Sequence, residues 1–211
     1  MTPSPRKIGV FGGAFDPPHN AHIALAQVAL TTLELDSLHI IPTGSAWHKA
    51  RTLTDAEHRL AMANLAFGTL PKVLVDDREI KRAGPTFTVD TLRALQQENL
   101  GAQLYLVMGA DQLAAFNQWH QWPEILKIAI VCVAARARIN WTIGQFDGYN
   151  QEKTRIIELP LPDMAISATQ IRQLVMGTPA GGLGENQAIA DLLPEPVARY
   201  IAQHQLYRLA M

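Results

Sequence analysis

The sequence predicts an α/β protein in which helices cover both faces of a parallel sheet. Along the 211 residues, short apolar runs alternate with segments of helical periodicity. Several of the runs are almost continuously apolar, which is typical of strands whose two faces are both buried. Connections between such strands are right-handed crossovers, so we expect one sheet. No repeat, low-complexity tract or linker interrupts the chain, and we therefore expect a single domain over residues 1–211.

Six segments have the length and composition of buried strands. The first follows a short polar N-terminal stretch, and the second is stopped by Pro42. The expected strands are Lys7–Phe11, Ser37–Ile41, Lys72–Asp76, Gln103–Met108, Ile128–Ala134 and Arg155–Leu159.

Two of the expected helices open with a capping-box pattern, in which a hydroxyl residue is followed three positions later by Glu or Gln. Thr54 with Glu57 and Ser167 with Gln170 show this pattern, and Gly177 is placed to end the helix that Ser167 begins. The expected helices are Asn20–Leu33, a segment that begins at Thr54, Thr88–Glu98, two short stretches near Gln112–Phe116 and Pro123–Lys127, Ala168–Met176 and Pro196–Gln203, with a glycine-rich loop over 180–187.

The composition excludes several classes of protein. With 48% hydrophobic and 18% charged residues the chain can bury a core, and its net charge of -1 gives no general attraction to nucleic acid or to an anionic membrane. No apolar run approaches the roughly 18 residues of a membrane span, and no signal peptide follows the N-terminus, so we expect a cytoplasmic protein. Cys132 is the only cysteine, which excludes a disulfide framework and a multi-thiolate zinc site. We expect it to be a small buried apolar side chain.

The connection between the first strand and the first helix, GGAFDPPHNAH at positions 12–22, is rich in turn and polar residues. In an open parallel sheet, ligands bind beyond the carboxyl ends of the strands, where this stretch lies. Gly12 and Gly13 allow close approach of the backbone, and the helix N-terminus offers free N–H groups to a phosphate. His19 and His22 share one face if the helix begins near His19. The stretch matches neither of the common glycine-rich phosphate motifs. The histidine pair also fits two zinc ligands, although no third ligand is evident.

Taken together, GGAFDPPHNAH and the later ISATQIR at 166–172 resemble the nucleotidyltransferases that carry an H-x-G-H signature and a distal I-S-x-T-x-x-R motif. Within that superfamily the chain is most similar to the bacterial nicotinate-nucleotide adenylyltransferases, and the likeness covers nearly its full length. Ala21 stands where the signature has glycine. Its Cβ could crowd the nucleotide or shift the helix start, although we expect the site to survive. Segments that also agree are DDREIKR at 76–82, GPTFTVDTL at 84–92, VMGAD at 107–111 and LLPEPVARYI at 192–201.

The resemblance implies a Rossmann-like doubly wound sheet with a C-terminal helical segment. It also implies a reaction in which ATP, with Mg²⁺, and nicotinate mononucleotide give deamido-NAD and pyrophosphate, a step of NAD biosynthesis. The mononucleotide phosphate would attack the α-phosphorus of ATP in line. Because that phosphate is already an anion, neither a general base nor a covalent enzyme intermediate is needed.

The same resemblance implies the residues of the site. Catalysis falls to His19, His22 and Arg172, with His22 the main stabiliser of the transition state. Trp119 would stack on the pyridine ring, and the backbone N–H of Thr88 would bind the nicotinate carboxylate. No protein side chain is expected to ligate a metal. The implied ATP contacts are Gly12, Gly13, Ala14, Phe15, His19, His22, Ser167, Thr169 and Arg172, and the implied nicotinate mononucleotide contacts are Phe15, Lys49, Thr88, Asp111 and Trp119.

Each of these assignments has a purely structural alternative. Ser167 can serve as a helix cap alone, and Arg172 can lie on a solvated helix face. Trp119 can be a core residue, and Lys49 can be an exposed loop residue. Asp16 is expected to brace the loop rather than to act in the reaction.

Other functions stay open at this point. The same fold could use nicotinamide mononucleotide or another phosphate acceptor, although Trp119 and residues 84–92 argue against phosphopantetheine. A nucleotide-binding regulator without activity, marked by Ala21, and a zinc hydrolase built on His19 and His22 are more distant alternatives. We expect no nucleic-acid or membrane partner, and a homo-oligomer is possible.

Overall fold

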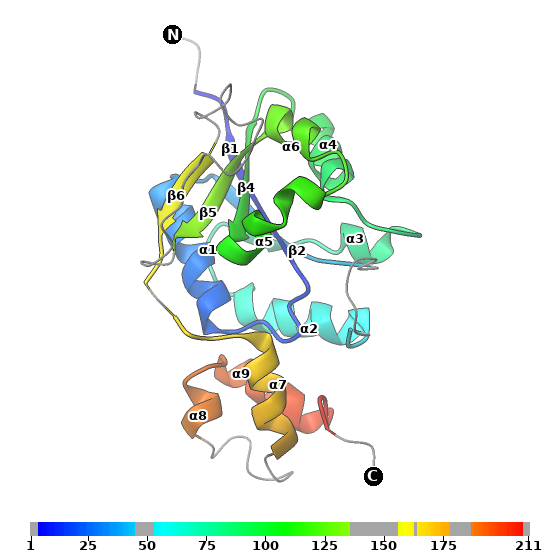
Figure 1. Cartoon of the computed structure of the whole chain (residues 1–211), viewed down its shortest axis with the longest axis vertical. Helices are drawn as coiled ribbons and strands as arrows, with labels where there is room; N and C mark the ends of the chain where they lie inside the picture. The colour runs from blue at the N-terminus through cyan, green and yellow to red at the C-terminus, as the bar shows by residue number, and fades with distance from the viewer. Residues whose placement is uncertain (1–3, 45–52, 136–155, 163, 178–186, 209–211) are drawn as a thin grey trace.

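The computed structural model of the chain describes residues 4–44, 53–135, 156–162, 164–177 and 187–208. Within them, six strands form one parallel sheet in the order β3-β2-β1-β4-β5-β6, with helices on both faces (Figure 1). The predicted α/β class and all six predicted strands are confirmed. The strands are β1 (Lys7–Gly13), β2 (Ser37–Pro42), β3 (Val73–Val75), β4 (Gln103–Gly109), β5 (Ala129–Ala135) and β6 (Ile156–Pro160).

β1 lies at the centre of the sheet, between the two halves of the doubly wound topology. Ile8 of β1 pairs with Ser37 of β2 on one side and with Leu104 of β4 on the other. Successive side chains of a strand point to opposite faces, and Val10 and Phe11 accordingly enter different core clusters. The order of the strands reverses between β1 and β4. Ligands of open α/β sheets bind at the carboxyl ends of the strands beside such a reversal.

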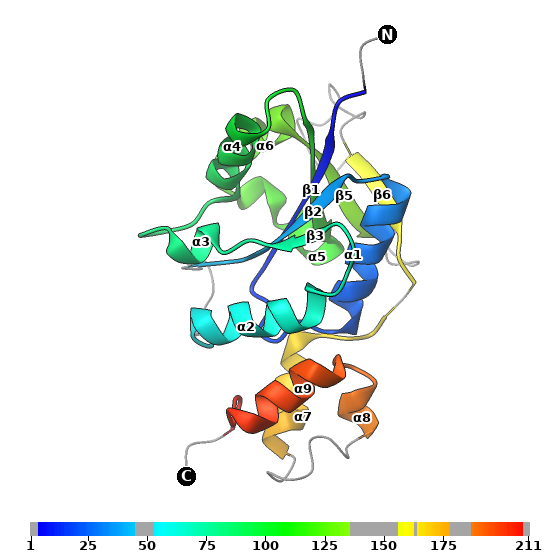
Figure 2. The same ribbon diagram turned by 180° about the vertical axis from the view of Figure 1, so that it is seen from behind.

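The two faces of the sheet have separate cores. Helices α1 and α2 cover one face and α4, α5 and α6 cover the other, while α7, α8 and α9 lie at the bottom of the view and add side chains to the α1–α2 core (Figures 1 and 2). The helices are α1 (Asn20–Thr32), α2 (Ala56–Phe67), α3 (Arg78–Lys81), α4 (Thr88–Glu98), α5 (Ala110–Ala114), the 3-10 helix η1 (Phe116–Gln118), α6 (Trp122–Ile128), α7 (Ala168–Gly177), α8 (Gln187–Ala190) and α9 (Glu195–Gln203).

The predicted capping box at Thr54 is wrong. Asp55 is the residue that precedes the first turn of α2, and no side-chain hydrogen bond caps this helix. Thr54 makes tertiary contacts instead. Its N–H donates to Oδ2 of Asp16 at 3.3 Å, and its carbonyl accepts from Nε of Arg59 at 2.8 Å. Its side chain hydrogen-bonds to Tyr207 rather than to the first turn of α2.

The second predicted cap is confirmed, because Oγ of Ser167 accepts the backbone N–H of Gln170 at 3.2 Å. Gly177 is the last residue of α7 rather than the residue after it. Helices α3 and α8 were not predicted, and each is only four residues long. Cys132 is fully buried in β5, and burial raises the pKa of its thiol to about 12, which makes it an inert core side chain.

Hydrogen bonds join the C-terminal helices to the start of α1. The backbone N–H of Asn20 donates to the carbonyl of Leu192 at 2.9 Å, and its side-chain amide donates to the carbonyl of Asp191 at 3.0 Å. The C-terminal segment is therefore fixed beside the loop that follows β1. Among the helices of the described ranges, none has both the length and the apolar character that a membrane crossing requires.

Candidate active site

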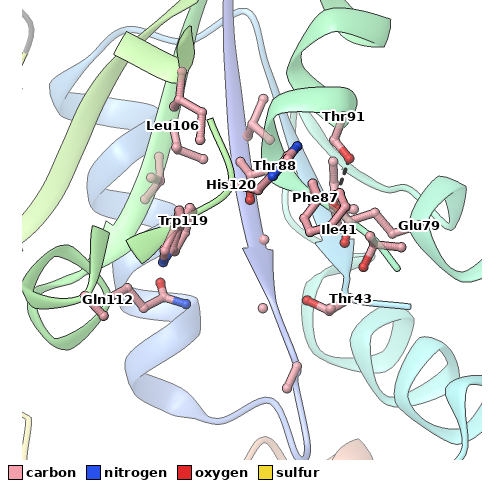
Figure 3. Close-up of a pocket in the computed structure, with 18 of the residues that line it drawn as sticks. Ile41, Thr43, Glu79, Phe87, Thr88, Thr91, Leu106, Gln112, Trp119 and His120 are labelled. Atoms are coloured by element: carbon pink, nitrogen blue, oxygen red, sulfur yellow. Dashed lines mark hydrogen bonds between the residues drawn. The ribbon is translucent and has the colours of Figure 1, made fainter. Parts of the chain in front are cut away.

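Two cavities of similar size open at the carboxyl ends of β1 and β4, with volumes of about 400 and 390 Å³. They share four lining residues, Gly12, Gly13, Ala14 and Gln112, so the loop after β1 forms the boundary between them. We call the one that contains Trp119 the apolar cavity (Figure 3) and the one that contains the histidine pair the polar cavity. Two ligands placed in the two cavities would meet at Gly12–Ala14.

The histidine pair stands at the start of α1, in the polar cavity. His19 is the residue that precedes the helix, and its ring stacks on that of His22 with centroids 3.7 Å apart and an interplanar angle of 24°. The backbone N–H of His19 donates to Nδ1 of His22 at 3.2 Å. A ring nitrogen that accepts a hydrogen bond carries no proton, so neutral His22 has its proton on Nε2. The helix begins at Asn20 despite Ala21, whose methyl group lines the cavity.

His19 is held as a neutral imidazole. Its side chain is 6% exposed, and burial lowers its pKa from 6.5 to about 4. Its Nδ1 is buried and finds no hydrogen-bond partner within the described part of the chain. An unsatisfied polar atom of this kind is costly in a folded protein and is frequently found where a ligand binds.

Phe15 supports the loop from below. Its backbone has a φ of 47°, a conformation that is uncommon for a side chain other than glycine, and its ring is 2% exposed. The ring packs edge-on against His22 and Phe67, with centroids 5.2 and 5.5 Å away. A Cβ at Gly13 would lie 3.0 Å from this ring, so glycine permits the close packing. Phe15 lines the polar cavity only, not the apolar one.

Arg172 reaches across from α7 to the same loop. One guanidinium nitrogen donates to the carbonyl of Asp16 at 2.7 Å, and the other donates to Oγ1 of Thr169 at 2.9 Å. The carboxylate of Asp16 accepts the hydroxyl of Tyr207 at 2.7 Å and the N–H of Thr54 at 3.3 Å. Asp16 therefore braces the loop, as expected, and its buried side chain links the C-terminal segment to the position of Arg172.

A second arginine, Arg59 of α2, fixes the loop from the other side. Its side chain is 2% exposed and donates to the carbonyls of Ala14 at 3.1 Å, Thr43 at 2.7 Å and Thr54 at 2.8 Å. Arg59 was not among the site residues predicted from the sequence. The sequence does carry an indication of its role, because Arg59 stands at helical spacing from the buried Met62 and would otherwise be an isolated charge on the apolar face of the helix.

Trp119 and Thr88 come together in the apolar cavity, as Figure 3 shows. Trp119 follows η1 and packs on Phe116 with ring centroids 5.4 Å apart. Thr88 is the first residue of α4, where backbone N–H groups have no partner inside the helix. Phe87 and His120 also line this cavity, and their rings pack with centroids 4.3 Å apart. An aromatic platform and a helix N-terminus thus face a common space.

Among the predicted nicotinate mononucleotide contacts, Phe15 and Asp111 line the polar cavity rather than the apolar one. Lys49 lies outside the described residues, as do the glycine-rich residues around Gly181. Glu79, Gln112 and His120 line the apolar cavity without having been given roles from the sequence. The remaining predicted residues line the polar cavity: Gly12, Gly13, Ala14, Phe15, His19, His22, Ser167, Thr169 and Arg172.

Comparison with known proteins agrees with this arrangement. The family model described as cytidylyltransferase-like matches residues 10–174. A protein of Albidiferax ferrireducens named "Probable nicotinate-nucleotide adenylyltransferase" is 50% identical over 205 residues, which are 97% of this chain and all of that protein. A protein of Bordetella petrii with the same name is 42% identical, over 96% of this chain and all of that protein.

Solved structures show the same fold at lower identity. The nicotinic acid mononucleotide adenylyltransferase of Plasmodium falciparum, solved in complex with NaAD, superposes with a TM-score of 0.77 at 17% identity. The superposition covers 96% of this chain and 97% of that one. Because it is 50% and 42% identical to these two relatives over nearly its full length, the chain belongs to the nicotinate-nucleotide adenylyltransferase family, within the cytidylyltransferase-like proteins.

Proposed function

We propose that this chain transfers the adenylyl group of ATP to the phosphate of nicotinate mononucleotide, giving deamido-NAD and pyrophosphate in NAD biosynthesis. The observation that carries the proposal is the pair of cavities that adjoin at Gly12–Ala14. One is lined by imidazoles, a guanidinium and a helix start, and the other by an aromatic platform. A triphosphate and a pyridine nucleotide placed in them would bring their reacting phosphates together over this loop.

In this proposal the polar cavity binds the triphosphate. Nε2–H of His22 donates to the α-phosphate, where negative charge grows as the mononucleotide oxygen attacks. Arg172, held in place by Asp16 and Thr169, binds the leaving phosphates. The bond from the attacking oxygen to the α-phosphorus forms as the bond to the bridging oxygen breaks, and the electron pair leaves with pyrophosphate. No proton has to be transferred.

We propose that Mg²⁺ enters with ATP as part of the substrate. In the described ranges, no three His, Cys, Asp or Glu side chains come together in a way that could hold a metal ion. The phosphates would therefore supply most of the ligands, as is usual for this ion. Asp111, in the wall of the polar cavity, is placed to bind a water of the ion or the hydroxyls of a ribose.

The apolar cavity binds the pyridine ring in this proposal. Trp119 stacks on the electron-poor ring, and the N-terminus of α4 at Thr88 binds the carboxylate of nicotinate. An amide in that position would present an NH₂ group that donates and cannot accept, so the acid is favoured over the amide.

We also propose that the chain acts as a single domain, which is supported by the side chains that the C-terminal helices add to the α1–α2 core.

The proposal is tested by product analysis. The purified protein is incubated with ATP, MgCl₂ and nicotinate mononucleotide, and dinucleotide and pyrophosphate are both quantified. We expect the two products in equal amounts. Pyrophosphate without dinucleotide would indicate hydrolysis of ATP, and the absence of both products would overturn the proposal.

A further inference from the structure

Among the described residues that line the apolar cavity there is one carboxylate, that of Glu79 in α3, and there is neither a lysine nor an arginine. The side chain of Glu79 is 7% exposed. His120 is the other titratable side chain among these described lining residues. Burying a carboxylate is costly, and here it also lies in a cavity that is proposed to receive an anionic ring substituent, so its role has to be found in its contacts with the protein.

The contacts of Glu79 lead to the start of α4. The hydroxyl of Thr91 donates to Oε1 of Glu79 at 2.8 Å, a hydrogen bond that is visible in Figure 3. Thr91 is 1% exposed and accepts a hydrogen bond from Arg82 at 3.3 Å. The side chain of Thr86 also hydrogen-bonds to Glu79. A carboxylate has enough lone pairs to accept from both threonines at once, which an alanine or a leucine in this position would not provide.

These two threonines bracket Thr88. Thr86 lies two residues before it, in the segment that leads into the helix, and Thr91 lies three residues after it, on the next turn of α4. Residues three apart on a helix lie on the same face. Glu79 therefore holds the first turn of α4 on both sides of the backbone that is proposed to bind the nicotinate carboxylate.

The electrostatic surroundings fit a hydrogen-bonding role. Burial raises the pKa of Glu79, and the charge of Asp76 acts in the same direction. The hydrogen bonds from Thr91 and Thr86 and the charge of Arg82 act against this rise. The carboxyl group is thus compensated by Thr91, Arg82 and Thr86 of the protein rather than by the ligand.

We propose that Glu79 is a positioning residue for substrate specificity: through Thr91 and Thr86 it fixes the first turn of α4 and so maintains the preference for an acid over an amide on the pyridine ring. This inference rests on the proposed function and adds a determinant of its specificity. Glu79 acts through the geometry of the turn, so the hydrogen-bond acceptor matters more than the charge.

The test measures kcat and KM with nicotinate mononucleotide and with nicotinamide mononucleotide at saturating ATP and Mg²⁺. We expect Glu79→Ala to lower the acid-to-amide ratio of kcat/KM at least fivefold, mainly through a higher KM for the acid, with the KM for ATP unchanged. Glu79→Gln should keep the ratio within about twofold of the wild type, because the amide oxygen still accepts the hydrogen bond from Thr91.

Two further variants keep the test decisive if Glu79→Ala does not fold. Thr91→Val preserves the shape of the side chain but removes the hydroxyl, and like Glu79→Ala it should lower the acid-to-amide ratio of kcat/KM.

Asp90→Ala is the matched control, because Asp90 is an acid of the same helical turn whose side chain is 45% exposed and pairs with Arg93 at the surface. Its ratio should equal that of the wild type.

Three results would overturn the inference. The ratio could survive Glu79→Ala and Thr91→Val, both variants could impair acid and amide equally, or Glu79→Gln could be as impaired as Glu79→Ala. Failure of the proposed function is recognised separately, because the wild-type protein would then form no dinucleotide from either substrate.

Discussion

The backbone N–H of His19 donates to Nδ1 of His22 at 3.2 Å, and the two rings stack with centroids 3.7 Å apart. This contact places the proton of neutral His22 on Nε2 and restricts the rotation of its ring against Phe15. The first helix thus begins with an imidazole whose donor is set before any ligand binds. Preorganisation of this kind makes a hydrogen bond more useful to a transition state than to a ground state.

From this geometry, we expect His22→Ala to lower kcat by about 10²–10³-fold, the usual effect of removing one preorganised donor. Binding of ATP should weaken much less, because the contact strengthens as charge develops on the α-phosphate. The measurements are kcat by pyrophosphate release and the Kd for ATP by calorimetry. His204→Ala, an exposed histidine that lines neither cavity, is the control. A kcat near that of the wild type would remove His22 from the mechanism.

The pKa of His19 predicts a pH dependence of stability. In the unfolded chain this imidazole binds its proton near pH 6.5, and in the folded protein only near pH 4. Between these values the unfolded state binds more protons, so the free energy of unfolding falls as the pH is lowered, by up to about 3 kcal/mol at pH 4. We expect His19→Asn to reduce this loss when urea unfolding is compared at pH 7 and pH 4.5. An identical loss in the variant would show that His19 is not responsible.

Tyr207 should influence ATP binding from the far end of the chain. Its hydroxyl donates to the buried Asp16, whose carbonyl accepts from Arg172. Burial and the charge of Asp16 raise the pKa of Tyr207, which keeps the hydroxyl protonated as a donor. Tyr207→Phe leaves Asp16 without this donor, which should cost about 1–3 kcal/mol of stability and raise the KM for ATP.

The matched control for Tyr207 is Tyr200→Phe. That hydroxyl bonds to Nδ1 of His58 at 2.9 Å, and neither residue is among the described residues that line the polar or the apolar cavity. It should lower the melting temperature slightly and leave the KM for ATP unchanged. If the two variants cannot be distinguished in their KM for ATP, Asp16 does not transmit the effect of the C-terminal segment.

Trp119→Ala should raise the KM for the pyridine nucleotide and leave the KM for ATP unchanged. Loss of one aromatic stacking partner costs about 1–3 kcal/mol, which corresponds to a rise of about 5- to 150-fold in the KM for that substrate. Trp122→Ala is the control, because Trp122 packs on the same Phe116 ring but does not line the apolar cavity. Equal effects of the two variants would mean that Trp119 is only a core residue.

Much of the fold followed from local pattern. The near-continuous apolar runs predicted the buried strands, and Ser167 predicted the start of α7, because these signals depend only on neighbouring residues. The cap at Thr54 was wrong because a tertiary contact with Asp16 and Arg59 replaced the local one. Helix α3 was missed since a single turn has almost no periodicity.

The polar cavity could be predicted more completely than the apolar one. His19, His22 and Arg172 stand in two compact motifs whose elements meet at one end of the sheet. The apolar cavity is assembled from residues on several elements, and Asp111, a predicted nicotinate mononucleotide contact, lines the polar cavity instead. Which cavity a residue at the end of β4 faces depends on the turn into α5, and the sequence carries no clear signal for that turn.

The chain is proposed to join ATP to a pyridine mononucleotide whose carboxylate binds at the start of α4. This proposal is tested by the rate of pyrophosphate release with ATP and Mg²⁺, with nicotinate and nicotinamide mononucleotide compared as acceptors under identical conditions. We expect pyrophosphate and dinucleotide in equal amounts, and a kcat/KM for the acid at least tenfold higher than for the amide. Equal use of the two acceptors would contradict the role given to Thr88, and no release with either would contradict the proposed reaction itself.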